Sequence, residues 1–129
     1  MTAPRILCVD DDSLINELNK IALTRAGYED EIASSPMDAL DRFRRATFDL
    51  VITDLFFPGH GEENFIAKLR NMAPTLPIIL TSGNHNPPAE VLKETDAFVE
   101  KAYSLSALTD SVREVLQKGR LRHHHHHVG

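Results

Sequence analysis

Leu50-Val51-Ile52-Thr53-Asp54 is a short run of apolar and β-branched residues that ends in a carboxylate. Such a run is typical of a strand that is covered on both faces of a sheet. Similar runs occur at Ile6–Val9, Ile78–Thr81 and Ala97–Val99. A fifth candidate strand, 29–33, alternates polar and apolar residues, so we expect it at an edge of the sheet. The sequence therefore predicts four buried strands and one edge strand.

Segments of helical period follow these runs. The first begins near Asp12 or Ser13, either of which can cap the free backbone amides, and it ends at Gly27. Its apolar residues on one face are Leu14, Leu18, Ile21 and Ala22.

Four more helices are expected further along the chain. One follows Ser35-Pro36, one runs from Phe65 to Met72, and a short one follows Pro87-Pro88. The last begins at Ser104 and runs out at Lys118-Gly119. The apolar residues expected to face the sheet from the three longer helices are Met37, Leu40 and Phe43, then Phe65, Leu69 and Met72, then Leu105, Leu108, Val112 and Val115 or Leu116.

Strands that alternate with helices predict parallel strands joined by crossover helices. We therefore expect an α/β fold with one doubly wound, five-stranded parallel sheet and five helices. The 129 residues, 42% of them hydrophobic, have room for one ordinary core. We expect one domain over 1–119 and a C-terminal tail over 120–129, whose run His123–His127 is typical of an expression tag, with a natural tail as the alternative.

The bulk composition excludes several classes of function. With 14 Lys and Arg against 19 Asp and Glu, the formal charge is -5, which offers no basic surface for nucleic acid or an anionic membrane. Cys8 is the single cysteine, so no disulfide or cysteine metal site is expected within the chain. No apolar run approaches the roughly 18 residues of a membrane span. We expect a cytoplasmic protein without a membrane segment.

Polar residues follow the predicted strands at the point where each strand ends. They are Asp10-Asp11-Asp12, Asp54, Thr81-Ser82 and Glu100-Lys101. In an open parallel sheet, ligands bind beyond the carboxyl ends of the strands, and neighbouring strands lie only about 4.8 Å apart. The sequence thus predicts a pocket that combines carboxylates, a hydroxyl group and an ammonium group.

Crowded carboxylates repel one another unless a cation neutralises them, and an all-oxygen set suits Mg²⁺ better than zinc. A carboxylate can also act as the nucleophile toward a phosphoryl group, while the metal and a lysine balance charge on the transferring oxygens. Asp54, at the end of the central predicted strand, is best placed for that role.

Taken together, these motifs resemble the response regulator receiver domain family of two-component signalling. The resemblance spans about Arg5 to Lys118, and the matching stretches are Ile6–Asp12, Val51–Gly59, Ile79–Gly83 and Phe98–Lys101. It implies a flavodoxin-like sheet with strand order 2-1-3-4-5. It also implies a histidine kinase or histidine phosphotransfer protein as phosphoryl donor, an output domain or downstream protein as target, and a second copy of the chain as a further partner.

The resemblance also implies a role for each matching residue of the pocket. Asp10 and Asp11 would hold Mg²⁺, Asp11 more directly, together with Asp54 and the backbone carbonyl of Phe56. Asp54 would be phosphorylated, and Asp12 would cap the first helix rather than bind metal.

Three further residues would carry the switch. Lys101 would pair with the acidic pocket and then with a phosphate oxygen. The hydroxyl of Thr81 would turn toward the phosphoryl group and draw Phe98 inward, which changes the surface formed by helix four, strand five and helix five. Since a phosphoryl group adds nearly two negative charges, a modest bias between two packings of that surface suffices.

The sequence departs from the family after Lys101, where Ala102 stands in place of the usual proline and its cis peptide bond. A cis bond before a residue other than proline costs roughly 3 kcal/mol, so we expect a trans bond here. Phe56, two residues after Asp54, is expected to shield the phosphoryl group from water. His60 and His85 are expected to be surface residues.

Three alternatives stay open at this point. The first is a small phosphohydrolase of the haloacid dehalogenase type with Asp10 as nucleophile, although only 28 residues follow Lys101. The second is a receiver-like interaction module that does not use phosphorylation. The third, a flavodoxin-like electron carrier, lacks a phosphate loop after the first strand. The resemblance to receiver domains implies that the chain is a phosphoacceptor rather than an enzyme with a separate substrate.

Overall fold

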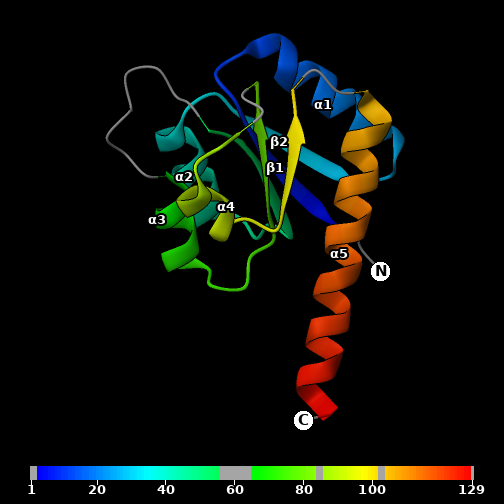
Figure 1. Ribbon diagram of the computed structural model, residues 1–129. Helices are drawn as coiled ribbons and strands as arrows, with labels where there is room; N and C mark the ends of the chain where they lie inside the picture. The colour runs from blue at the N-terminus through cyan, green and yellow to red at the C-terminus, as the bar shows by residue number, and fades with distance from the viewer. Residues whose placement is uncertain (1–2, 56–64, 84–85, 102–103, 129) are drawn as a thin grey trace.

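The computed structural model describes residues 3–55, 65–83, 86–101 and 104–128. Five parallel strands form one sheet in the order β2-β1-β3-β4-β5 (Figure 1). The strands are β1 (Arg5–Val9), β2 (Glu29–Ala33), β3 (Leu50–Asp54), β4 (Ile78–Ser82) and β5 (Ala97–Glu100). The helices are α1 (Ser13–Arg25), α2 (Pro36–Arg45), α3 (Phe65–Met72), α4 (Ala89–Lys93) and α5 (Leu105–Val128). The expected fold class, strand order and edge position of 29–33 are confirmed. The prediction of a fourth buried strand at 97–99 is wrong, because β5 forms the other edge of the sheet and Val99 is its only buried residue.

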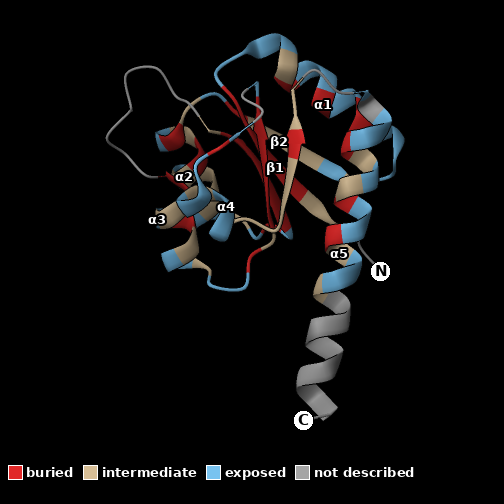
Figure 2. Ribbon diagram, in the orientation of Figure 1, coloured by how far each residue is buried: buried red, intermediate tan, exposed pale blue. Residues whose placement is uncertain are grey.

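Helices cover both faces of the sheet, α1 and α5 on one side and α2, α3 and α4 on the other (Figure 1). Alternate residues of each strand therefore enter two separate cores. In β1, Ile6 and Cys8 pack with α1 and α5, whereas Leu7 and Val9 pack on the opposite face. Figure 2 shows the central strands β1, β3 and β4 as the most continuously buried part of the described chain, whereas β2 and β5 are largely half-buried. Strands buried on both faces explain why the sequence reads there as apolar runs.

The register aligns the carboxyl ends of the central strands. Val9 at the end of β1 pairs with Thr53 on β3, and Asp54 pairs with Thr81 on β4. The polar residues at these strand ends consequently reach the same edge of the sheet.

The apolar face expected for α1 is wrong in its orientation. Leu14, Leu18 and Ile21 are exposed, and the buried residues of this helix are Asn16, Asn19, Ala22 and Leu23. The helix begins where expected, because the Asp12 side chain accepts hydrogen bonds from the backbone amides of Leu14 and Ile15. The end of the helix is as expected, since Gly27 adopts a left-handed φ of 92°.

The expected end of the last helix is also wrong, because α5 continues past Gly119 to Val128. A glycine ends a helix by adopting a left-handed conformation, and among the described residues only Gly27 has a positive φ. Leu108, Val112 and Val115 are buried as expected, and the side chain of Leu105 lies outside the described part. The inward positions expected for Met37 and Met72 are wrong, because both are exposed, while Leu40 and Phe43 of α2 are half-buried and Phe65 and Leu69 of α3 are buried. Across the described ranges, no helix is both long and apolar enough to cross a membrane.

Candidate functional site

Three carboxylates meet at the carboxyl edge of the sheet. Asp10 and Asp11 directly follow β1, and Asp54 is the last residue of β3. Oxygens of the three side chains all lie within 4.8 Å of one another. Asp10 and Asp54 are buried, and Asp11 is exposed, so the cluster is open to solvent on one side. The structure thus brings together the three carboxylates that the strand-end pattern predicted.

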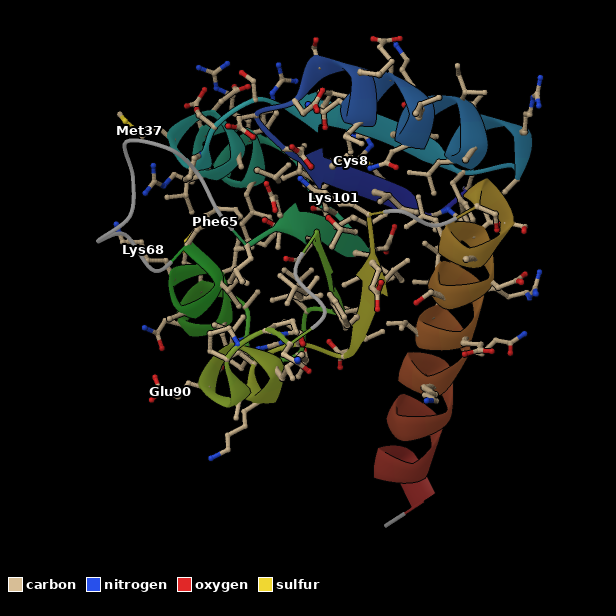
Figure 3. All side chains as sticks on the ribbon, turned by 45° about the horizontal axis from the view of Figure 1, so that its top comes forward. Cys8, Met37, Phe65, Lys68, Glu90 and Lys101 are labelled. Atoms are coloured by element: carbon tan, nitrogen blue, oxygen red, sulfur yellow. The ribbon has the colours of Figure 1, made fainter. Side chains whose placement is uncertain are left out.

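Lys101 closes the pocket from the end of β5. Its Nζ lies 2.9 Å from Asp10 Oδ2 and 2.9 Å from Asp54 Oδ2. The backbone N–H of Lys101 donates to the carbonyl of Ser82 at 2.9 Å, which ties its main chain to the end of β4. In Figure 3, Lys101 lies over this edge of the sheet, between β1 and β3. One ammonium group therefore bridges two buried carboxylates.

Burial and charge act in opposite directions on these groups. Burial raises the pKa of Asp10 above its usual 3.8, although the backbone N–H of Asp12 and the ammonium of Lys101 favour the charged carboxylate. Burial by itself would lower the pKa of Lys101, but the hydrogen bonds and charges of Asp10 and Asp54 outweigh it and raise that pKa. The pocket thus favours the protonated form of Lys101, while burial disfavours the charged form of Asp10.

The first turn after β1 holds the acidic residues in place. Asp10 Oδ1 accepts a hydrogen bond from the backbone N–H of Asp12 at 2.9 Å. Asp12 itself caps α1, as the resemblance implied. Asn16 donates from Nδ2 to the backbone carbonyl of Asp10 at 2.8 Å, a contact that the sequence did not point to. Asn16 lies seven residues before the buried Leu23 and hence on the same helix face, which the apolar pattern of the sequence did not reveal.

The two residues expected to switch, Thr81 and Phe98, have different surroundings. Thr81 pairs with Asp54 in the sheet, but its hydroxyl donates to the backbone carbonyl of Thr53 at 3.4 Å. Phe98 is half-buried, pairs with Leu80, and packs against the core on the α2, α3 and α4 side. Thr81 is thus next to the predicted phosphorylation site, while Phe98 belongs to a core cluster.

Several predicted residues lie outside the described part of the chain. They are Phe56 with its backbone carbonyl, Ala102 with the peptide bond before it, His60 and His85. The shielding role of Phe56, the trans bond before Ala102 and the surface position of the histidines remain predictions.

The donor atoms of the pocket fit a hard divalent cation. All three candidate ligands are carboxylate oxygens, which Mg²⁺ prefers. Cys8, the single cysteine, is fully buried, and burial raises the pKa of its thiol, so it offers neither a thiolate ligand nor a nucleophile. Asp10 is poorly suited as a nucleophile, because Asp12 and Lys101 engage its two oxygens separately.

Comparison with known proteins identifies the family. Residues 6–113 match the response regulator receiver domain family. The protein-glutamate methylesterase/protein-glutamine glutaminase 1 of Anaeromyxobacter dehalogenans is 33% identical over 119 residues, which make up 92% of this chain and 30% of that protein. The transcriptional regulator NtrC of a Bradyrhizobium strain is 33% identical over 85 residues, which are 66% of this chain and 18% of that protein. The chain thus spans less than a third of either relative.

Solved structures agree with this family. A CheY-like receiver domain protein of Methanospirillum hungatei has a TM-score of 0.84 at 25% identity, covering 94% of this chain and 99% of that one. The response regulator TrrA of Thermotoga maritima, solved in complex with Mg²⁺ and BeF, has a TM-score of 0.79 at 31% identity, covering 87% and 98%. With the family match over most of its length, this chain belongs to the response regulator receiver domains, the phosphoacceptor modules of two-component signalling.

Proposed function

We propose that Asp54 takes the phosphoryl group, from a phosphohistidine of a histidine kinase or histidine phosphotransfer protein. The observation that carries this proposal is the position of Lys101, whose Nζ lies 2.9 Å from both Asp10 and Asp54 within a cluster of three carboxylates. An ammonium group held there can follow negative charge as it moves from a carboxylate to a phosphoryl group.

Asp54 is favoured over its neighbours by its place in the sheet. It ends the central strand β3, next to Thr81 on β4 and within ion-pair distance of Lys101 from β5. Asp11 is exposed, and Asp10 is buried and engaged by Asp12 and Lys101. Of the three carboxylates in the cluster, Asp54 is thus the one whose residue pairs with Thr81 in the sheet and that also lies within ion-pair distance of Lys101.

The proposed reaction is a direct transfer between two side chains. A carboxylate oxygen of Asp54 attacks phosphorus, the bond from phosphorus to the donor imidazole nitrogen breaks, and the imidazole leaves with that electron pair. Lys101 then shifts from the neutralised carboxylate to a phosphoryl oxygen. Thr81 leaves the carbonyl of Thr53, its weak partner at 3.4 Å, and donates to another phosphoryl oxygen. That movement makes room for Phe98 to turn inward and alter the surface of α4, β5 and α5.

The three carboxylates would hold Mg²⁺, with the backbone carbonyl of Phe56 as a further ligand from the resemblance. When bound, Mg²⁺ neutralises charge on the phosphoryl oxygens. The fit rests on the donor set itself, an all-oxygen cluster with one exposed member, Asp11.

The domain would act within a larger signalling arrangement. We infer a receiver domain over 1–119 whose own reactions are limited to taking up and losing the phosphoryl group. Its location would be the cytoplasm, where a histidine kinase could reach it. The relatives of which this chain covers 30% and 18% support an output domain or downstream protein as the target. A homodimer through α4, β5 and α5 is a further expectation.

The test is the intact mass of the protein after incubation with Mg²⁺ and acetyl phosphate. We expect a gain of about 80 Da, one phosphoryl group, in the parent and none in Asp54→Asn. No gain in a folded parent that binds Mg²⁺ would favour an interaction module that does not use phosphorylation. Phosphate turnover that survives Asp54→Asn but not Asp10→Asn would favour the hydrolase alternative.

A further inference from the structure

The backbone carbonyl of Asp10 lies just beyond the sheet. Val9 is the last paired residue of β1, with Ala33 and Thr53 as its partners. The N–H of Asp10 still donates to the carbonyl of Ala33 at 3.1 Å, but its own carbonyl has no place in either ladder. Asp10 is only 2% exposed. A buried carbonyl without a donor is destabilising, so this position needs a donor from elsewhere.

Asn16 supplies that donor from the first turns of α1. Its Nδ2 donates to the carbonyl of Asp10 at 2.8 Å, and its backbone N–H donates to the carbonyl of Asp12 at 3.1 Å. One residue thus bonds to both ends of the turn that contains Asp11. Because Asp12 donates back to Asp10 Oδ1, the same turn also sets the direction of the Asp10 carboxylate.

An asparagine is an unusual choice for this helix position on stability grounds. Asn16 is 3% exposed on the face of α1 that also buries Ala22 and Leu23. Its Oδ1 is buried and has no hydrogen-bond partner among the described residues. An amide that satisfies only one of its two ends retains a desolvation penalty, which a residue serving packing alone would avoid. Local rules of this kind are broken mainly at functional sites.

We propose that Asn16 is a positioning residue, whose amide holds the Asp10–Asp12 turn so that the carboxylates of Asp10 and Asp11 face Asp54. The inference rests on the proposed function, since it assigns the residue that orders the metal-binding carboxylates. Asn16 touches neither metal nor phosphoryl group and acts through the main chain of Asp10. Its removal therefore affects Mg²⁺ binding first and phosphorylation through it.

The experiment is a calorimetric titration of MgCl₂ into the parent, Asn16→Leu and the matched control Asn19→Leu. Asn19 is buried on the same face of α1, three residues further along the helix. Circular dichroism checks that all three proteins are folded at the titration temperature. We expect the Mg²⁺ dissociation constant to rise about 10- to 100-fold in Asn16→Leu, and to stay close to the parent value in Asn19→Leu.

A second readout separates positioning from general destabilisation. In Asn16→Leu, the Mg²⁺ concentration that gives half-maximal phosphorylation by acetyl phosphate should rise by the same factor. The rate at saturating Mg²⁺ should change less, because the bound cation restores the order of the turn. If Asn16→Leu does not fold, Asn16→Ser replaces it, since its hydroxyl is too short to reach the carbonyl of Asp10 and should weaken Mg²⁺ binding in the same way.

The outcomes distinguish this inference from the proposed function. Equal Mg²⁺ affinity in the parent and the Asn16 variant overturns the positioning role and leaves the proposed function standing. An equal loss in the Asn16 and Asn19 variants also overturns it, because the effect would then belong to the helix and not to Asp10. A folded parent that binds no Mg²⁺ overturns the proposed function and the inference with it.

Discussion

Burial makes the surroundings of Asp10 unfavourable for a charged carboxylate. Burial raises its pKa above the usual 3.8, and the hydrogen bond from Asp12 and the ion pair with Lys101 offset this only in part. The charged form of Asp10 is therefore less stable in the folded chain than in the unfolded chain. The proposed Mg²⁺ would offset this cost, because a bound cation stabilises the charge that burial disfavours.

A pH dependence of stability follows. Between pH 3.8 and the raised pKa, the folded chain binds more protons at Asp10 than the unfolded chain does. The stability contributed by protonated Asp10 is complete below pH 3.8 and is lost as the pH rises through the folded pKa. In EDTA, the free energy of unfolding of Asp10→Asn minus that of the parent should thus increase from about pH 4 to pH 7. Urea denaturation at both pH values measures it.

The control for removal of one negative charge is Asp110→Asn on α5, where the exposed Asp110 forms an ion pair with the exposed Arg113. The difference in free energy of unfolding between Asp110→Asn and the parent should change less over the same pH range. A difference for Asp10→Asn that stays constant or shrinks toward pH 7 contradicts the burial penalty on Asp10.

At the residue scale, the sequence located the carboxylates and the lysine but not their support. Asp10, Asp54 and Lys101 each follow or end a strand, and this position alone brings them to one edge of a parallel sheet. Asn16 was missed, because the burial of a polar residue depends on the rotation of its helix, which the apolar pattern of α1 misrepresents. The direction of the Thr81 hydroxyl depends on a side-chain torsion that no sequence pattern encodes.

Among the elements, the end of α3 is fixed to two other segments by Arg70. Its Nη1 donates to the carbonyls of Pro74 and Leu76, at 2.9 and 2.7 Å, and its Nη2 donates to the carbonyl of Glu94 at 2.7 Å. The same guanidinium contacts the carboxylate of Asp96, which accepts the backbone N–H at the start of β4. One half-buried side chain thus joins the end of α3, the start of β4 and the turn after α4.

We expect Arg70→Met to lower the free energy of unfolding by about 2–3 kcal/mol, because partly buried carbonyl groups lose their donor. Chemical denaturation measures the loss. Amide hydrogen exchange should rise around Glu94 and Asp96, where the turn loses its link to α3.

Arg45→Met is the control, since the pair of Arg45 with Asp41 is exposed, and it should cost less than about 0.5 kcal/mol. Similar losses in the two variants would mean that the Arg70 contacts contribute no more than a surface ion pair. The sequence placed Arg70 on a helix, but its acceptors come from segments up to 26 residues away. The periodicity of apolar residues indicates which residues share a helix face, but it does not predict contacts with distant segments.

Local sequence patterns also predict helix ends and buried helix faces only in part. The start of α1 at Asp12 and its end near Gly27 were predictable, because local cap chemistry decides them. The predicted end of α5 at Gly119 was wrong, because a glycine ends a helix only where the backbone adopts a left-handed conformation. The helix continues instead to Val128. Leu18 and Ile21 were assigned to an inward face by spacing alone, although the sheet lies under the neighbouring face of α1.

At the scale of the whole molecule, apolar runs revealed the strands but not their neighbours. In the order β2-β1-β3-β4-β5, the consecutive strands β2 and β3 are separated because β1 lies between them, and nothing in the periodicity of the runs encodes that arrangement. The family resemblance supplied it. Both cores are nevertheless built from the strand residues that the apolar runs marked, since burial on two faces requires apolar side chains at every position.

The extent of the domain gives the last prediction. The buried side chains described for α5 are Leu108, Val112 and Val115, and all of them precede Gly119. The free energy of unfolding of a chain of residues 1–119, measured in urea, should therefore differ from that of the full chain by less than about 0.5 kcal/mol. A shorter chain, 1–111, lacks Val112 and Val115 and should lose about 3–6 kcal/mol, the value of two buried valines. A loss above about 1 kcal/mol in 1–119 would show that the last turns of α5 stabilise the domain, and its boundary would then lie beyond residue 119.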